Sequence, residues 1–217
     1  MIELTDPAPA AGDRYLLLAD ISGYTAFMAS VEQAHGVDFS GGIPVGFAVL
    51  GELLDAVIVG VQPEFAIAKL EGDAVFAVAL AGTLDGRGDA VLGRLQELYG
   101  AFRARRDQAR DANDHVCTAC PVVASLDLKM VLHRGQVVRQ TIGSQSELLG
   151  PAVNVAHRLL KNSIQARLGY RPYLFLTDAA ASGLDLAEPG VEHREDYPDV
   201  GPVRGRVVPL GAEPTEA

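Results

Sequence analysis

The stretch LLLADISGYTAF, residues 16–27, carries an apolar run to an aspartate and then turns at once into a helix. The run at 15–19 has no alternating polar residues, which predicts a central strand that is buried on both faces. The residues after Asp20 predict a helix start, with Ser22 or Thr25 as its cap. This junction would hold a carboxylate at the end of a rigid strand.

The composition describes a globular domain. The chain has 217 residues, of which 48% are hydrophobic and 21% charged, and its formal net charge is −10. A strongly acidic chain lacks the basic surface that non-specific nucleic-acid binding requires, so we expect no nucleic-acid partner. We see neither a signal peptide nor an apolar run of about 18 residues, so we expect no membrane partner and a cytoplasmic location.

The remaining patterns predict an α+β domain. Helical spacing covers residues 22–36, 45–61, 90–113, 150–169 and 178–183, and apolar runs predict strands at 65–70, 74–80, 122–132, 136–139, 172–176 and 203–210, the last at a sheet edge. The order β-α-β-β-α-β is that of a ferredoxin-like core, an antiparallel sheet with helices on one face, here followed by extra C-terminal strands. We expect a flexible arm at 1–13, one domain at 14–211 and a tail at 212–217.

Two aspartates are candidates for a metal site. Asp20 ends the first strand, and Asp73 lies in the turn of the predicted hairpin. A ferredoxin-like sheet places the first strand beside this hairpin, so both carboxylates would converge. Paired carboxylates suit Mg²⁺ or Mn²⁺, which prefer oxygen ligands. Singly, Asp20 is equally explained as a helix N-terminal residue and Asp73 as a turn former.

Four stretches, in order along the chain, resemble signatures of the class III nucleotidyl cyclases, the adenylyl and guanylyl cyclase family. LLLADISGYTAF is similar to F-x-D-[IV]-x-[GS]-[FY]-T, and KLEGDAVFAVA to K-x-x-G-D-[AS]. LKMVLHRGQVV resembles basic-x-G-[IV]-H-x-G-x-[VI], and GPAVNVAHRL resembles G-x-x-V-N-x-A-x-R-[LM]. The resemblance spans about residues 15–210 and implies the cyclase catalytic-domain fold.

The resemblance implies two-metal catalysis. Asp20, the carbonyl of Ile21 and Asp73 would bind two Mg²⁺ or Mn²⁺ ions per site, one acting on the ribose 3′-hydroxyl and one holding the triphosphate. The turn after the first strand would place backbone N–H groups near the phosphates. The residues of this turn are Ser22, Gly23, Tyr24 and Thr25.

The resemblance also implies roles for four further side chains. Asn154 and Arg158 lie four residues apart on one helix face, where Asn154 would orient the ribose and Arg158 would stabilise charge on the α-phosphate. Lys69 and Glu147 would read the base: a lysine donates to adenine N1 and a carboxylate accepts from the 6-amino group. ATP is therefore favoured, although cytosine presents a similar polarity. Alternatively, Lys69 pairs with Glu71, and Glu147 is a solvated loop residue.

Several features depart from the family pattern. The basic residue of the third signature is Lys129 instead of arginine, and the tail lacks the usual triphosphate-binding lysine, so Arg204 or Arg206 would have to replace it. The segment HVCTAC contains three soft ligands and could form a zinc or redox site. A structural zinc site usually has four protein ligands, so the alternative is that the two cysteines are partly buried thiols. These ligands are His115, Cys117 and Cys120.

Two functions from different classes follow. The first is a homodimeric cyclase that makes a 3′,5′-cyclic nucleotide and pyrophosphate at the subunit interface. One subunit would supply Asp20 and Asp73 and the other Asn154 and Arg158, with the base-reading residues also meeting across the interface. The second is a catalytically silent domain that binds a nucleotide or a regulatory partner. All four of these residues are present, which favours the enzyme.

Overall fold

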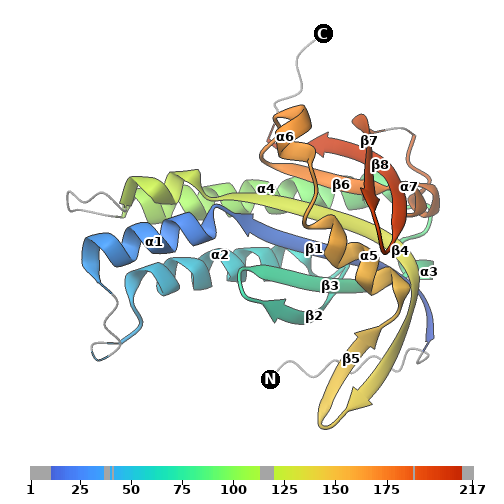
Figure 1. The fold of residues 1–217 in the computed structure, drawn as a ribbon, viewed down its shortest axis with the longest axis horizontal. Helices are drawn as coiled ribbons and strands as arrows, with labels where there is room; N and C mark the ends of the chain where they lie inside the picture. Colours follow the sequence, from blue (N-terminus) through green and yellow to red (C-terminus); the bar gives the residue numbers. More distant parts are fainter. Residues whose placement is uncertain (1–10, 37–39, 41, 113–119, 188, 212–217) are drawn as a thin grey trace.

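The structure is a computed structural model that describes residues 11–36, 40, 42–112, 120–187 and 189–211 (Figure 1). The strands are β1 Ala11–Ser22, β2 Ala66–Glu71, β3 Ala74–Leu80, β4 Asp127–Ile142, β5 Gln145–Leu149, β6 Tyr173–Thr177, β7 Val191–Tyr197 and β8 Gly201–Pro209. The helices are α1 Tyr24–His35, α2 Val45–Val61, α3 Ala81–Leu84, α4 Gly88–Asp111, the 3₁₀ helix η1 Cys120–Ser125, α5 Pro151–Leu159, α6 Ile164–Leu168 and α7 Asp178–Leu184. None of the helices in these ranges is long and apolar enough to cross a bilayer.

The sheet confirms the predicted α+β class. Its strand order is β2-β3-β1-β4-β6-β8-β7, and β5 pairs with β4 outside this path. The four strands β2, β3, β1 and β4 are antiparallel and form the ferredoxin-like core. β6 joins β4 in parallel and starts the C-terminal extension. The prediction of an edge strand at 203–210 is wrong, because β8 lies between β6 and β7.

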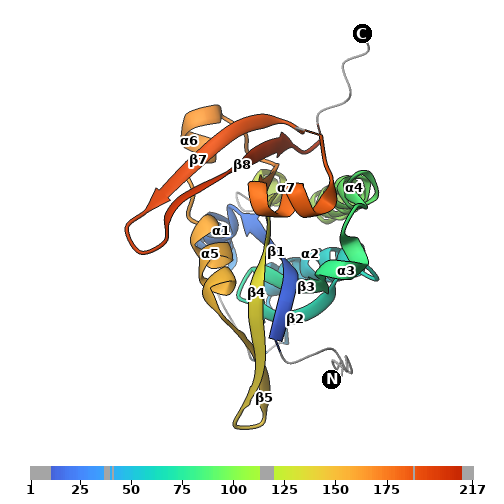
Figure 2. The ribbon, with the colours of Figure 1, turned by 90° about the vertical axis from the view of Figure 1, so that its right-hand side faces the viewer.

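Side chains of β1 alternate between two hydrophobic cores. Leu17 and Ile21 pack in the core that α1, α2 and α4 cover, whereas Leu16 and Leu18 pack in the core that α5 and α6 cover. Figure 2 shows α5 and α4 on opposite sides of β4. The expectation of helices on one face is therefore corrected: both faces of the central strands are covered, which explains why β1 has no polar alternation.

Strand boundaries at both ends of the core differ from the predictions. β1 begins at Ala11, which pairs with Val138 of β4, so the last part of the expected arm belongs to the sheet. The strand expected from 122 begins at Asp127, after the turns of η1. Pairing across the sheet decides both boundaries, and local composition does not reveal it.

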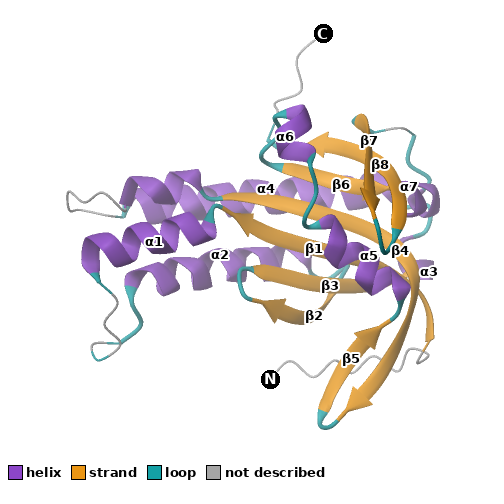
Figure 3. Cartoon of the chain, viewed as in Figure 1, coloured by secondary structure: helices purple, strands orange, loops and turns teal. Residues whose placement is uncertain are grey.

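β4 is one continuous strand through the sequence HRG, which the sequence had suggested as a break. Gly135 lies under α5, and a Cβ at this glycine would stand 2.7 Å from the Cβ of Ala152. The glycine therefore permits close packing of a helix on the strand. Beyond it, β4 and β5 extend as a long hairpin away from the sheet (Figure 3).

Gly135→Ala is expected to lower the free energy of unfolding by about 1–3 kcal/mol, because the added methyl group overpacks the β4–α5 contact. The matched control is Gly93→Ala in α4, where nothing lies within 4 Å of the added Cβ. This control should raise stability by about 1 kcal/mol or less. Urea denaturation measures both, and equal effects of the two substitutions would contradict the packing argument.

The helix predicted over 150–169 is divided into α5 and α6. Asn162 and Ser163 interrupt it. The side-chain Oδ1 of Asn162 accepts from the N–H of Ile164 at 3.1 Å, and Ser163 donates from its N–H and its hydroxyl to Glu195 on β7, both at 2.7 Å. Such short polar side chains compete with helical hydrogen bonds. Gly169 ends α6 with a left-handed φ of 73°.

Candidate functional site

The end of β1 and the β2–β3 turn lie side by side. Asp20 is opposite Ala74 in the strand register, and the N–H of Ile21 donates to the carbonyl of Asp73 at 3.1 Å. Burial and the negative charge of Asp20 raise the pKa of the Asp73 carboxyl. The structure therefore brings Asp20 and Asp73 together, as the sheet topology predicted.

A lysine balances part of this negative charge. Lys129 on β4 places its Nζ 3.0 Å from Oδ2 of Asp20, and both side chains are mostly buried. No group of three or more His, Cys, Asp or Glu side chains with metal-binding geometry occurs among the described residues. The donors here are two carboxylates and the Ile21 carbonyl. This small oxygen set fits Mg²⁺, which binds through one or two carboxylates and fills its other positions with water and substrate phosphates.

The turn between β1 and α1 depends on a glycine. Gly23 caps α1 with φ 89°, and a Cβ there would stand 3.2 Å from the carbonyl of Ser125. Neither Ser22 nor Thr25 caps the helix through its side chain, so that prediction is wrong. Ser22 is the last residue of β1 and Thr25 is exposed. Burial and the nearby Asp73 charge raise the pKa of Tyr24.

One open cavity of about 820 Å³ joins the acidic end of β1 to α5. Asp20 and Lys129 line one side, and Asn154 and Arg158 of the same chain line another. The remaining lining residues are His157, Leu160, Lys161, Asp199 and Val200. A single chain therefore brings together side chains that the sequence assigned to different subunits.

Arg158 has an ion-pair partner in the chain. Its Nη2 lies 2.5 Å from Oδ2 of Asp199, which lies in the turn between β7 and β8, and both side chains are about half exposed. Sequence reasoning missed Asp199 and Lys161, which line the cavity of about 820 Å³ that we call the groove. Lys161 follows α5 directly and could have been considered from the helix alone, whereas nothing near Asp199 in the sequence indicates its contact with Arg158.

Lys69 and Glu147 meet within one chain, which corrects the expectation that they meet across an interface. The Nζ of Lys69 is 3.6 Å from Glu147 on β5 and 3.1 Å from Glu71 on its own strand. Hydrogen bonding to Glu71 is the largest influence that raises the pKa of Lys69. Ala68, Phe76 and Val78 form an apolar wall beside them, around a cavity of only about 10 Å³. Lys69 therefore contacts both of the carboxylates that the sequence offered as alternative partners, Glu71 and Glu147.

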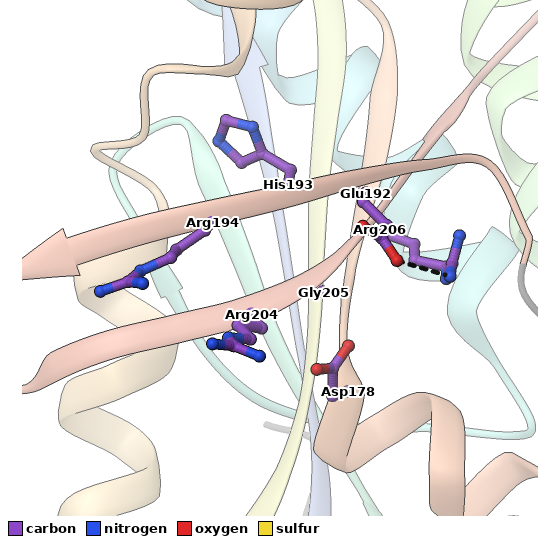
Figure 4. Close-up of a pocket in the computed structure, with 7 residues that line it drawn as sticks. All are labelled: Asp178, Glu192, His193, Arg194, Arg204, Gly205 and Arg206. Atoms are coloured by element: carbon purple, nitrogen blue, oxygen red, sulfur yellow. Dashed lines mark hydrogen bonds and ion pairs between the residues drawn. The ribbon is translucent and has the colours of Figure 1, made fainter.

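Arg204 and Arg206 lie on the opposite face of the sheet from the groove. Arg206 is opposite Leu176, which belongs to the α4-side core, whereas alternation along β1 places Asp20 on the α5 side. Figure 4 shows both arginines with Arg194 in a separate cavity of about 460 Å³ between β7, β8 and the start of α7. Within a single chain Arg204 and Arg206 therefore lie away from the cavity that Asp20 lines, and their contact with the triphosphate stays a prediction.

The possible zinc or redox ligands cannot be placed. His115 and Cys117 lie outside the described residues, as does the side chain of Cys120. The third signature contains a different histidine, His133, which is partly buried. Nδ1 of His133 lies 3.0 Å from the hydroxyl of Thr177, and burial lowers the pKa of His133 to about 4.

His133 should make the fold sensitive to acid. Since its folded pKa is depressed from 6.5, the folded state binds the proton less well, and stability is complete above about pH 6.5. Below that pH we expect the free energy of unfolding to fall by up to about 1.4 kcal/mol per pH unit towards pH 4. His133→Gln should reduce this slope, and His35→Gln on α1 should not. Urea titrations across pH 4–7 measure it; an unchanged slope in His133→Gln would contradict the assignment.

Comparison with solved structures identifies the fold. A bacterial light-regulated adenylyl cyclase superposes with a TM-score of 0.66 and 17% identity over 96% of this chain and 54% of that protein. The adenylyl cyclase CyaB from P. aeruginosa superposes with a TM-score of 0.60 and 14% identity over 94% of this chain and 97% of the other. The domain therefore has the adenylyl and guanylyl cyclase catalytic-domain fold.

Sequence comparison identifies the family. The uncharacterised protein Rv2561/Rv2562 of Mycobacterium tuberculosis is 35% identical over 136 residues, which are 63% of this chain and 60% of that protein. This chain thus matches less than two thirds of the length of that relative. The family model described as "Protein of unknown function (DUF2652)" matches residues 50–168, which include the β2–β3 turn, β4 and α5. The chain therefore belongs to the DUF2652 family.

Proposed function

We propose that this protein is a nucleotidyl cyclase that converts ATP, in preference to other nucleoside triphosphates, into the 3′,5′-cyclic nucleotide and pyrophosphate. The observation that carries the proposal is the groove of about 820 Å³, which Asp20, Lys129, Asn154 and Arg158 line in a cyclase-type fold. These four side chains are a carboxylate, two cations and an amide, and Asp73 lies beside Asp20 at the neighbouring β2–β3 turn. Such charges suit the positioning and neutralisation of phosphate groups in phosphoryl transfer.

Asp20, Asp73 and the Ile21 carbonyl would hold Mg²⁺ or Mn²⁺, two ions per site. Bound there, the ions would supply Lewis-acid activation of the 3′-hydroxyl and neutralise phosphate charge. The raised pKa of Asp73 supports this assignment, because burial and the charge of Asp20 disfavour the ionised Asp73 carboxylate and a bound cation would relieve this.

The chain's own residues would position the reaction. The ribose 3′-oxygen attacks the α-phosphorus, loses its proton, and displaces pyrophosphate as the new P–O bond forms. Asn154 would orient the ribose, and Arg158 would donate to the α-phosphate oxygens as negative charge accumulates. Lys129, whose Nζ lies 3.0 Å from Asp20, would donate to the β- or γ-phosphate.

Base reading would use Lys69 and Glu147, which lie 3.6 Å apart in the same chain. The lysine would donate to adenine N1, and the carboxylate would accept from the 6-amino group.

We further propose a homodimer. Exposed apolar residues follow the hairpin of β4 and β5, which leaves the sheet: Val138 is 44% exposed, Ile142 52% and Leu149 41%. Long apolar side chains on a protruding hairpin favour burial against a second copy. A dimer would also allow a second chain to close the groove, which is open in the single chain.

A second candidate function has a specific observation in its favour. Within one chain, Asp20 is already paired with Lys129 and Arg158 with Asp199. A domain that keeps these pairs would bind a nucleotide or a partner protein without turnover. The enzyme remains the first proposal because Asp20, Asp73, Asn154 and Arg158 are all present.

Incubation of the purified protein with Mn²⁺ and each of ATP, GTP, CTP and UTP tests the proposal, with cyclic products identified by mass. We expect cyclic AMP to be the main product. Another cyclic nucleotide would retain the reaction and overturn the base assignment. Nucleotide binding without any product would favour the silent domain.

A further inference from the structure

Lys69 contacts two carboxylates, the expected partner Glu147 and also Glu71. Its ammonium lies 3.1 Å from Glu71 and 3.6 Å from Glu147, and it is about 43% exposed, whereas the Glu71 side chain is only 26% exposed. Glu71 is two residues further along the same strand, so both side chains lie on one face of β2. This carboxylate is therefore built into the wall of the proposed base site.

Glu71 is itself fixed by α5. Nε2 of His157 lies 3.0 and 2.9 Å from the two carboxylate oxygens of Glu71. Nδ1 of the same ring lies 2.8 Å from the carbonyl of Val153, and the ring packs edge-on against Phe76 with a centroid distance of 5.2 Å. The imidazole is therefore held on three sides.

These contacts determine which groups donate. A carboxylate and a backbone carbonyl are both acceptors, so His157 donates to both only when both ring nitrogens carry a proton. The resulting charge-assisted hydrogen bond holds Glu71 in place. Glu71, fixed in this way, in turn accepts from one N–H of the Lys69 ammonium.

The orientation of the remaining donors follows. A lysine ammonium has three N–H donors. Glu71 takes one and Glu147 is within reach of a second, so the third is directed away from both carboxylates. Without Glu71 the ammonium would keep only its contact with Glu147 and would turn about it, so the donor directed at the base would lose its fixed direction.

We propose that Glu71 and His157 are positioning residues that orient Lys69 toward the N1 acceptor of a 6-amino purine. This inference rests on the proposed cyclase function and refines its base site. The Glu71–His157 hydrogen bonds link β2 to α5, the helix that carries Asn154 and Arg158. They would therefore keep Lys69 at a fixed position relative to these two residues. Neither Glu71 nor His157 needs to touch the nucleotide in this arrangement.

Glu71→Gln and His157→Gln test the inference in the full-length protein. Each is expected to raise the KM for ATP about tenfold and to leave kcat within about twofold, because the loss affects base binding and not the reacting phosphate. The preference for ATP over GTP in kcat/KM should fall by a similar factor. The double variant should be no worse than either single variant, since both act through one lysine. Glu52→Gln on α2, which also removes a paired carboxylate, is the control and should change none of these values.

A measurement without turnover accompanies the kinetics. Nitrogen NMR of the histidine rings should show both nitrogens of His157 protonated in the wild type, and this signature should be lost in Glu71→Gln. Fluorescent ATP and GTP analogues measure binding in the same samples. Unchanged discrimination in both folded variants, or additive effects in the double variant, would overturn the inference alone. A wild type that binds no nucleotide would overturn the proposed function together with it.

Discussion

Asp73→Asn is expected to lower the rate of cyclic nucleotide formation at least about 10³-fold, because it removes one of two carboxylates that would hold the metal ions. The substitution keeps the size of the side chain and the backbone bond from Ile21 to residue 73. Mass detection of the cyclic product at saturating Mn²⁺ measures the effect. Asp13→Asn, an ion-paired carboxylate at the other end of β1, is the matched control and should retain activity.

The same variant should be at least as stable as the wild type. The pKa of Asp73 is raised in the folded protein, so the ionised carboxylate destabilises the fold at neutral pH, and its removal should raise the free energy of unfolding. Loss of activity together with unchanged or higher stability would separate a functional role from a structural one. An active Asp73→Asn enzyme would exclude the proposed metal site.

Arg158→Ala is expected to reduce turnover by about 10²–10³-fold, the usual effect of removing one donor to developing charge. The KM for ATP should change less than kcat. Arg194→Ala, which removes another exposed arginine paired with an aspartate, is the control and should leave turnover unchanged. Steady-state kinetics with ATP and Mn²⁺ measure both variants.

Mixing inactive subunits decides where the site lies. If one subunit supplies Asp73 and the other Arg158, a mixture of Asp73→Asn and Arg158→Ala should recover about a quarter of the wild-type activity, since half of the dimers are mixed and each contains one intact site. The structure allows another outcome, because Asp20 and Arg158 of one chain line the same cavity. No recovery in a mixture shown to contain mixed dimers would establish a site within a single chain.

Much of the fold could be predicted from local patterns. The run VGFAVLGELLDAVIVGV corresponds to α2 at both ends, and the hairpin turn lies where Gly72 permits a left-handed φ of 66°. The convergence of Asp20 and Asp73 also followed, because the ferredoxin-like order determines which strands are neighbours. The metal-binding role of these two aspartates was predicted from sequence motifs, and Asp73→Asn tests it.

Errors arose where a distant segment determines the local structure. Gly135 resembles a turn residue, yet it allows α5 to pack on β4, which no neighbour in sequence reveals. Asn162 and Ser163 divide a helix because Glu195, about 30 residues later, binds the interruption. In both cases the contact depends on layers of the domain that come together only after folding.

The sequence by itself determined the fold class and the order of the core elements from β1 to β4, because repeats of two and 3.6 residues can be recognised along the chain. It did not reveal β5, β7 or the division of the helix over 150–169. Only the tertiary structure decided which charges meet: Arg206 faces away from the groove, Asp199 binds Arg158, and Glu71 joins Lys69 to α5. The physical reason is that strand register and helix packing select the face on which each side chain lies, and a shift of one residue in register would reverse it.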